Sequence, residues 1–188
     1  MKDSKSKKIA ICGAAGHLNL IHDFGCHQGD TWVLGAHYGN MPMRPDGKRA
    51  DRIYEIHGQE NKFAKMFSDP FHRNKLKGEE IWLAHDTDWA NVLPYEGIMT
   101  MFPTQKVSLC GGSSISWMLA HALFENEFGI EAYSEIHLLG VDMAAGSEWG
   151  YQRDSLFYLI GRAEAAFIDI VIPDDSKLIC DHKLYWWV

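Results

Sequence analysis

The chain reads Ile-Ala-Ile-Cys-Gly-Ala-Ala-Gly over residues 9–16. Four consecutive apolar residues are typical of a strand that is buried on both faces of a parallel sheet. The glycines that follow allow a tight turn and a close approach of the backbone to a ligand. We therefore predict that residues 9–12 form the first strand of a Rossmann-like α/β fold, with the turn at its ligand-binding edge.

The rest of the chain alternates between short apolar runs and segments with helical spacing. The clearest strand covers residues 136–142, and the clearest helix covers 113–128. Further strands are expected at residues 31–34, 52–57, 80–84 and 168–172, and further helices at 18–24, 60–77 (which Pro70 must interrupt or end) and 152–167. The stretches 39–50 and 86–105 read as irregular. Because strands separated by helices imply right-handed crossovers, we predict a three-layer α/β/α sandwich with a mostly parallel sheet, in a single domain over residues 1–188.

Both ends of the chain depart from this alternation. Residues 1–8 hold four lysines and are expected to be a flexible basic tail, because chain ends usually fray. Residues 181–188 form an aromatic tail that ends in Tyr-Trp-Trp-Val. Such an apolar end usually docks on the body of the protein or on another subunit, so a homo-oligomer formed through this tail is one expectation.

Composition limits the class of protein. With 46% hydrophobic and 23% charged residues, the chain has an ordinary globular composition and needs no disulfide or metal to fold. Its net charge of −7 opposes non-specific binding to nucleic acid or to an anionic membrane. The four cysteines include no Cys-x-x-Cys pair, and no apolar run reaches the roughly 18 residues of a membrane helix. Because no signal peptide is visible, we expect a cytoplasmic protein.

Two glycine-containing turns are candidate ligand contacts. Gly13, Ala14 and Gly16 follow the first predicted strand, and ligands bind beyond the carboxyl ends of such strands. We predict that these residues contact a nucleotide; the alternative is a tight turn without a ligand.

The second turn opens the clearest helix. Gly112, Ser113 and Ser114 would offer free backbone N–H groups, the helix dipole and hydroxyls to an anion. The alternative is a plain helix cap. No lysine follows the glycines, which argues against a P-loop mechanism.

Acidic, basic and imidazole side chains follow other strands. Asp142 ends a buried strand, where it would bind a metal ion or a ribose hydroxyl, or orient a base; the alternative is a loop cap. Tyr151 and Arg153 are candidate phosphate contacts, although Arg153 equally suits a structural ion pair. His37 follows the second strand and His57 ends the third. Either could act as a general acid or base, although satisfied surface or core histidines are commoner. We select Asp142, His57 and Arg153 as candidate catalytic residues, and His37 and Tyr151 as candidate binding residues.

The sequence gives a weaker signal for a metal site than for a nucleotide site. Asp86 and Asp88 form an acidic pair after the fourth strand. Acidic loop residues are common, so we assign no metal ligands and leave a need for Mg²⁺ open.

Several motifs together resemble known families. SSISWMLAHALF at residues 113–124, EIHLLGVDM at 135–143, YQR at 151–153 and DIVIP at 169–173 resemble a broad group of Rossmann-like proteins, many from bacteriophages and prophages. More distantly, the layout is similar to the Campylobacter-type sialyltransferases and to the archaeal hydroxymethylpterin pyrophosphokinase family.

The sialyltransferase resemblance implies a site for a CMP-sugar. It implies that Gly13 and Gly16 touch the nucleotide, that Gly112, Ser113 and Ser114 lie against its base or ribose, and that Tyr151 contacts phosphate. That family has asparagines at the first two strand ends, where this chain has alanine or histidine. This difference concerns the transfer of a sugar rather than the binding of a nucleotide.

The sequence therefore predicts a nucleotide-binding, transferase-like protein that acts on a nucleotide or on a nucleotide-activated substrate of the sugar or pterin type. As an enzyme it would transfer a glycosyl or pyrophosphoryl group. The alternative is a non-catalytic phage protein that binds or sequesters a nucleotide or a host factor. A site for S-adenosylmethionine is disfavoured because no acidic residue ends the second strand.

Overall fold

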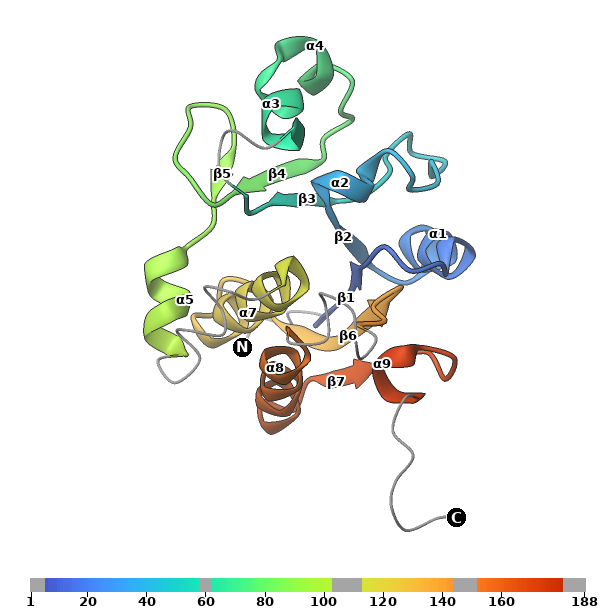
Figure 1. Cartoon of the computed structure of the whole chain (residues 1–188), viewed down its shortest axis with the longest axis vertical. Helices are drawn as coiled ribbons and strands as arrows, with labels where there is room; N and C mark the ends of the chain where they lie inside the picture. The colour runs from blue at the N-terminus through green and yellow to red at the C-terminus, as the bar shows by residue number, and fades with distance from the viewer. Residues whose placement is uncertain (1–5, 58–61, 103–112, 144–151, 181–188) are drawn as a thin grey trace.

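The computed structural model describes residues 6–57, 62–102, 113–143 and 152–180. Its strands form one seven-stranded sheet with the order β5-β4-β3-β2-β1-β6-β7, in which every neighbouring pair is parallel (Figure 1). The strands are β1 (Lys7–Cys12), β2 (Asp30–Leu34), β3 (Arg52–Glu55), β4 (Glu80–Leu83), β5 (Asn91–Val92), β6 (Tyr133–Leu139) and β7 (Asp169–Val171). The predicted Rossmann-like α/β architecture is thus confirmed, and the sheet is parallel throughout.

Helices cover both faces of the sheet (Figure 1). They are α1 (Leu18–His27), α2 (Gly35–Tyr38), α3 (Lys62–Ser68), α4 (Pro70–Arg73), α5 (Tyr95–Met101), α7 (Ser114–Glu127), α8 (Arg153–Ala165) and α9 (Lys177–Cys180). Helices α5, α7 and α8 pack on one face, whereas α1 and α3 pack on the other. The result is a three-layer α/β/α arrangement.

The first strand shows why its sequence lacks polar alternation. Ile9 and Ile11 belong to the core under α5, α7 and α8, whereas Ala10 and Cys12 belong to the core under α1 and α3. All four side chains are fully buried. A strand in the middle of a parallel sheet must be apolar on both faces because helices cover both.

The strand order reverses at β1. The chain leaves β1 for β2 on one side, and it later places β6 on the other side of β1. In open α/β sheets, such a reversal leaves a crevice beyond the carboxyl ends of the two strands, where ligands bind. The topology therefore points to the loops that follow β1 and β6.

Local chemistry sets several helix ends. The Ser113 side chain accepts a hydrogen bond from Ser116 N at 3.1 Å and so caps α7. The predicted helix over 60–77 is broken at Pro70, as expected: Asp69 caps a new short helix by accepting from Phe71 N at 2.8 Å.

Some predictions were wrong in detail. The stretch 86–105, expected to be irregular, contains β5 and α5. Helices α2 and α9, each four residues long, had no clear sequence signal. Lys7 and Lys8, assigned to the basic tail, belong to β1, and their ammonium groups lie 2.7 and 2.9 Å from Glu131 and Glu135. The aromatic tail at 181–188 lies outside the described residues.

A buried polar network joins the amino ends of the strands to α7. Arg52 donates two hydrogen bonds to Glu125, at 2.8 and 2.9 Å, and its guanidinium lies 4.5 Å from the Trp32 ring centroid. The Tyr133 hydroxyl also donates to Glu125, at 2.5 Å. The Tyr54 hydroxyl lies 2.8 Å from Nδ1 of His121, a residue of α7 that is 1% exposed. These contacts satisfy groups that would be costly to bury unpaired.

None of the helices that the structure describes combines the length and the apolar character that a bilayer crossing requires.

The buried imidazole gives a prediction about stability and pH. Burial, and then the nearby Arg52 cation, lower the pKa of His121 from 6.5 to about 3. The unfolded chain therefore binds a proton more tightly than the folded protein, so the stability linked to His121 is complete above pH 6.5 and is lost as the pH falls. Between pH 6 and 4 the free energy of unfolding should fall by up to about 1.4 kcal/mol per pH unit from this group alone.

Urea unfolding at several pH values checks this slope. In His121→Asn the slope should be smaller than in the wild type by that amount, whereas the exposed control His27→Asn should keep the wild-type slope. Equal slopes in wild type and His121→Asn would show that His121 does not titrate in this way.

Candidate functional site

The loops after β1 and β6 are joined by close backbone contact. Gly13 N donates to Leu139 O at 2.8 Å, and Ala15 N donates to Gly140 O at 2.9 Å. A Cβ atom on Gly13 would lie only 2.3 Å from the Gly140 carbonyl oxygen. Gly140 itself has a φ of +67°, a conformation that glycine adopts without strain. The glycines are thus required by the approach of the two loops to each other.

A cavity of about 220 Å³ opens beside these joined loops. It lies beyond the carboxyl ends of β1, β2 and β6 and against the first turn of α7. Its lining is mainly apolar and comprises Gly13, Ala14, Ala15, Leu34, His37, Ser113, Ser114, Ile115, Gly140, Val141, Asp142 and Met143. Segments that are far apart in the sequence thus meet where the topology predicts a crevice.

Asp142 brings a carboxylate to this cavity. Its Oδ1 accepts from Lys177 N at 3.3 Å, at the start of α9. The same turn is attached by Ser176, whose hydroxyl donates to Val141 O at 2.9 Å. These contacts hold the carboxylate at the edge of the sheet. They also agree with the alternative interpretation of Asp142 as a residue that caps the local loop.

Ser113 and Ser114 line the cavity from the amino end of α7. The Ser113 hydroxyl already caps the helix, as the simpler alternative predicted. Its neighbour in the turn, Ser116, lies with its hydroxyl 3.2 Å from that of Ser155, which connects α7 to α8. The end of α7 is therefore fixed in place, and its positive dipole end faces the cavity.

His37 faces the cavity from α2, the single helical turn that follows β2. Partial burial lowers its pKa below the ordinary value of 6.5. The ring is therefore neutral at neutral pH and keeps a nitrogen lone pair that can accept a hydrogen bond or a proton.

His57 lies outside the cavity lining. Its ring is 60% exposed, and Nδ1 lies 2.5 Å from Oε1 of Glu55, whose side chain is 3% exposed. The same carboxylate oxygen accepts from His57 N at 3.0 Å. A buried carboxylate thus holds one ring nitrogen and leaves Nε2 on the exposed side.

Arg153 has a structural environment. It is 6% exposed, and its guanidinium donates to Leu178 O at 2.5 Å, so it fastens α8 to α9. The acceptors are backbone carbonyls, so these contacts are structural, although they are not the ion pair offered as the alternative to a phosphate contact. Gly16 does not line the cavity; it has a φ of +58° in the turn before α1. Gly112 and Tyr151 lie outside the described residues.

Sequence reasoning missed the apolar part of the lining. The large apolar side chains of the lining belong to Leu34, Ile115, Val141 and Met143. From the sequence, each of these residues was assigned only to a strand, a helix or a loop. Their position at or just after a strand end, or at a helix start, was the available signal. Within the described ranges, no three His, Cys, Asp or Glu side chains are grouped closely enough to hold a metal ion.

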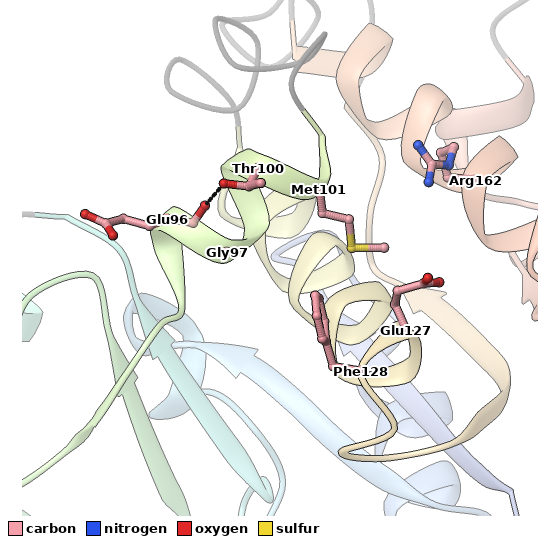
Figure 2. Close-up of a pocket in the computed structure, with 7 residues that line it drawn as sticks. All are labelled: Glu96, Gly97, Thr100, Met101, Glu127, Phe128 and Arg162. Atoms are coloured by element: carbon pink, nitrogen blue, oxygen red, sulfur yellow. Dashed lines mark hydrogen bonds between the residues drawn. The ribbon is translucent and has the colours of Figure 1, made fainter.

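A larger hollow lies elsewhere on the surface. It has a volume of about 410 Å³ and is formed by α5, the end of α7 and α8 (Figure 2). Figure 2 shows Met101 and Glu127 extending toward the space in front of Arg162. Because α7 starts at the carboxyl edge of the sheet and ends near β6's first residue, this hollow is remote from the loops after β1 and β6.

The fold is similar to that of sialyltransferases from Campylobacter jejuni. The monofunctional α-2,3-sialyltransferase Cst-I gives a TM-score of 0.62 at 16% identity, over 93% of this chain and 78% of that one. The apo form of an α-2,3-sialyltransferase gives 0.61 at 15%, with the same coverage. The sialyltransferase CstII in complex with cytidine-5'-monophosphate gives 0.57 at 14%, over 92% and 82%. At these identities the similarity shows a shared fold.

No family model matches the chain, and neither does any curated protein. The shared fold confirms, at the level of structure, the predicted likeness to Campylobacter-type sialyltransferases. The likeness to the phage group and to the pyrophosphokinase family stays a prediction.

The loop contact can be tested by adding one methyl group. In Gly13→Ala the new Cβ would overlap the Gly140 carbonyl, so the loops must separate, and we expect a loss of about 1–3 kcal/mol in the free energy of unfolding. The matched control is Gly161→Ala in α8, where nothing lies within 4 Å of a new Cβ. That helix should become more stable, by up to about 1 kcal/mol. Urea unfolding measures the free energy of unfolding of both variants. A Gly13→Ala variant as stable as the wild type would contradict the described contact.

Proposed function

We propose that the cavity beside β1 and β6 binds the nucleoside part of a nucleotide, and that the protein transfers a group from a nucleotide-activated substrate. The observation that carries the proposal is the meeting of Gly13, Ser113 and Asp142 at one apolar cavity where the strand order reverses. The solved structures of similar fold include CstII in complex with cytidine-5'-monophosphate, which supports a cytidine nucleotide as the first ligand to try.

The size and lining of the cavity suit a base and a ribose. Sites for whole drug-sized ligands usually measure roughly 300–1,000 Å³, and this cavity of about 220 Å³ is smaller. Leu34, Ile115 and Met143 offer apolar surface to a base. Asp142 offers a carboxylate, which can accept hydrogen bonds from ribose hydroxyls. The activated group would then extend out of the cavity.

The start of α7 offers a binding position for a negatively charged group. Backbone N–H groups in the first turn of a helix are free to donate, and the helix dipole is positive there. Ser114 lies in this turn and lines the cavity. A phosphate attached to the ribose would be stabilised at this position as its charge develops during transfer.

The Glu55–His57 pair supplies a proton acceptor along the same edge. The parallel register pairs Leu34 of β2 with Tyr54 of β3, so His57 lies three residues beyond the level of Leu34. Strands are spaced about 4.8 Å apart, which separates the carboxyl ends of β1 and β3 by roughly 10 Å. A substrate that extends from the cavity across β2 would bring its reacting end toward His57.

In the proposed step, Nε2 of His57 takes the proton of the acceptor hydroxyl. The acceptor oxygen forms a bond to the transferred carbon, and the bond from that carbon to the nucleotide phosphate oxygen breaks. The phosphate keeps the electron pair near the start of α7. Glu55 fixes the ring tautomer and balances the imidazolium charge, as a carboxylate does beside many catalytic histidines.

Isothermal titration with CMP tests the binding part. We expect saturable binding to the wild type, and about tenfold weaker binding to Asp142→Asn, because a charge-assisted hydrogen bond to the ribose is replaced by a neutral one. Asp23→Asn, an exposed change on α1, is the control and should bind as the wild type does. Absence of CMP binding, or equal affinities for Asp142→Asn and wild type, would count against a ribose at Asp142.

Release of CMP from CMP-activated sialic acid, the type of donor seen in the analogue bound to CstII, tests the chemical part. His57→Gln should lower kcat by about 100-fold while leaving CMP affinity unchanged, because general base catalysis is lost and binding is not. Glu55→Gln should lower kcat less, because the ring loses its charged hydrogen-bond partner but keeps Nε2. A wild type that binds CMP but releases none from this donor or from other CMP-sugars would instead indicate a binding protein.

A further inference from the structure

A second cavity lies on the opposite side of α2 from the proposed nucleotide cavity. It has a volume of about 270 Å³ and is bounded by α2, α3 and the turn that follows α4. His37 of α2 lines the first cavity, whereas Ala36 and Tyr38 line the second. Successive side chains point in different directions around a helix, so one short helix separates the two spaces.

The floor of the second cavity is apolar. Phe67 is 1% exposed and belongs to the core beneath α3, and Met66 and Leu76 pack against that core. On the α2 side the wall consists of Ala36 and Tyr38 together with two residues that have no side chain, Gly35 and Gly39. A flat apolar group could therefore lie between α2 and α3.

The rim of this cavity carries the ammonium group of Lys75 and the imidazole of His72. His72 and Lys75 line it, and among the residues that line it in the described structure none is acidic. The Lys75 ammonium lies 3.9 Å from the Phe71 ring centroid, and neither His72 nor Lys75 forms an ion pair with a carboxylate within the described ranges.

The surrounding segment strengthens this charge. Residues 62–80 contain five Lys or Arg residues and three Asp or Glu residues, an excess of two positive charges in a chain whose net charge is −7; one of these carboxylates, Glu79, accepts a hydrogen bond from the Tyr38 hydroxyl at 2.8 Å. A local excess of cations beside a concave surface raises the local concentration of anions.

We propose that this second cavity is a binding site for a small organic anion with a flat apolar body and one phosphate or carboxylate group. The ring of the ligand lies on Phe67 and Leu76, and its anionic group faces Lys75 and His72. The site is separate from the nucleotide cavity, so the proposal does not depend on the proposed function. The shared helix α2 places such a ligand directly behind His37.

Phenyl phosphate is a probe of this chemistry, because it joins an aromatic ring to a single anionic group. With ¹⁵N-labelled protein, we expect saturable amide shifts at residues 35–39 and 64–76, with a dissociation constant of about 1 mM. Benzyl alcohol, which keeps a ring but has no charge, should bind about tenfold more weakly or not at all. Added CMP should leave these shifts in place.

Two variants locate the site. Gly39 lines the cavity and has a φ of −62°, so Gly39→Leu is free of backbone strain and adds bulk to the α2 wall. Lys75→Met removes the cation while keeping most of the length of the side chain. Each should weaken phenyl phosphate binding by about tenfold or more.

Matched controls make the same chemical changes elsewhere. Gly161→Leu places a leucine in open space on α8, and Lys62→Met removes an exposed cation on α3 that does not line the cavity. Both should bind phenyl phosphate as the wild type does.

Four results would overturn the proposal: no saturable shifts up to about 10 mM phenyl phosphate, shifts centred on residues 13–15 and 140–143 instead, undiminished binding to Gly39→Leu, or equal binding of benzyl alcohol.

Discussion

The contact between the backbones after β1 and β6 is the constraint on which the site depends. Gly13 and Gly140 approach so closely that neither position has room for a side chain. This contact fixes two loops at the place where the strand order reverses, and it leaves α7 and α2 to close the remaining sides of a cavity. The site is therefore a consequence of the topology, and the residues in it need only short side chains or none.

The amino ends of the strands, on the opposite side of the sheet from the cavity, are built differently. There Arg52, Glu125 and Tyr133 form a buried polar network with short hydrogen bonds, and His121 joins the same region to β3 through Tyr54. Buried networks of this kind hold elements in one arrangement when every member is satisfied. The amino ends of the strands are thus tightly connected, whereas their carboxyl ends leave space for ligands. Helix α7 connects the two, because it carries Glu125 and His121 and begins at the cavity with Ser113.

The sequence predicted the strands best where burial leaves a plain signal. Ile9 to Cys12 are apolar on both faces, which a central parallel strand requires, and residues 136–139 are apolar except for His137. Ser113 caps its helix as its position indicated. Helix α2 escaped prediction because a single turn of Gly-Ala-His-Tyr has no periodicity to detect. Arg153 could not be assigned from sequence, since its partners are carbonyl groups 24 and 25 residues away that exist only in the fold. Of the glycines in the predicted nucleotide turn, Gly13 has a steric role that the sequence could not distinguish from a ligand contact.

The fold shared with the Campylobacter sialyltransferases leaves the chemistry to be decided by particular residues, because one fold supports many functions. A crystal structure of this protein with CMP is the most direct measurement. We predict that the base lies between Leu34 and Ile115 and that the ribose hydroxyls contact Asp142, with the phosphate toward the first turn of α7. A nucleotide bound in the hollow of Figure 2, or against the second face of α2, would contradict it.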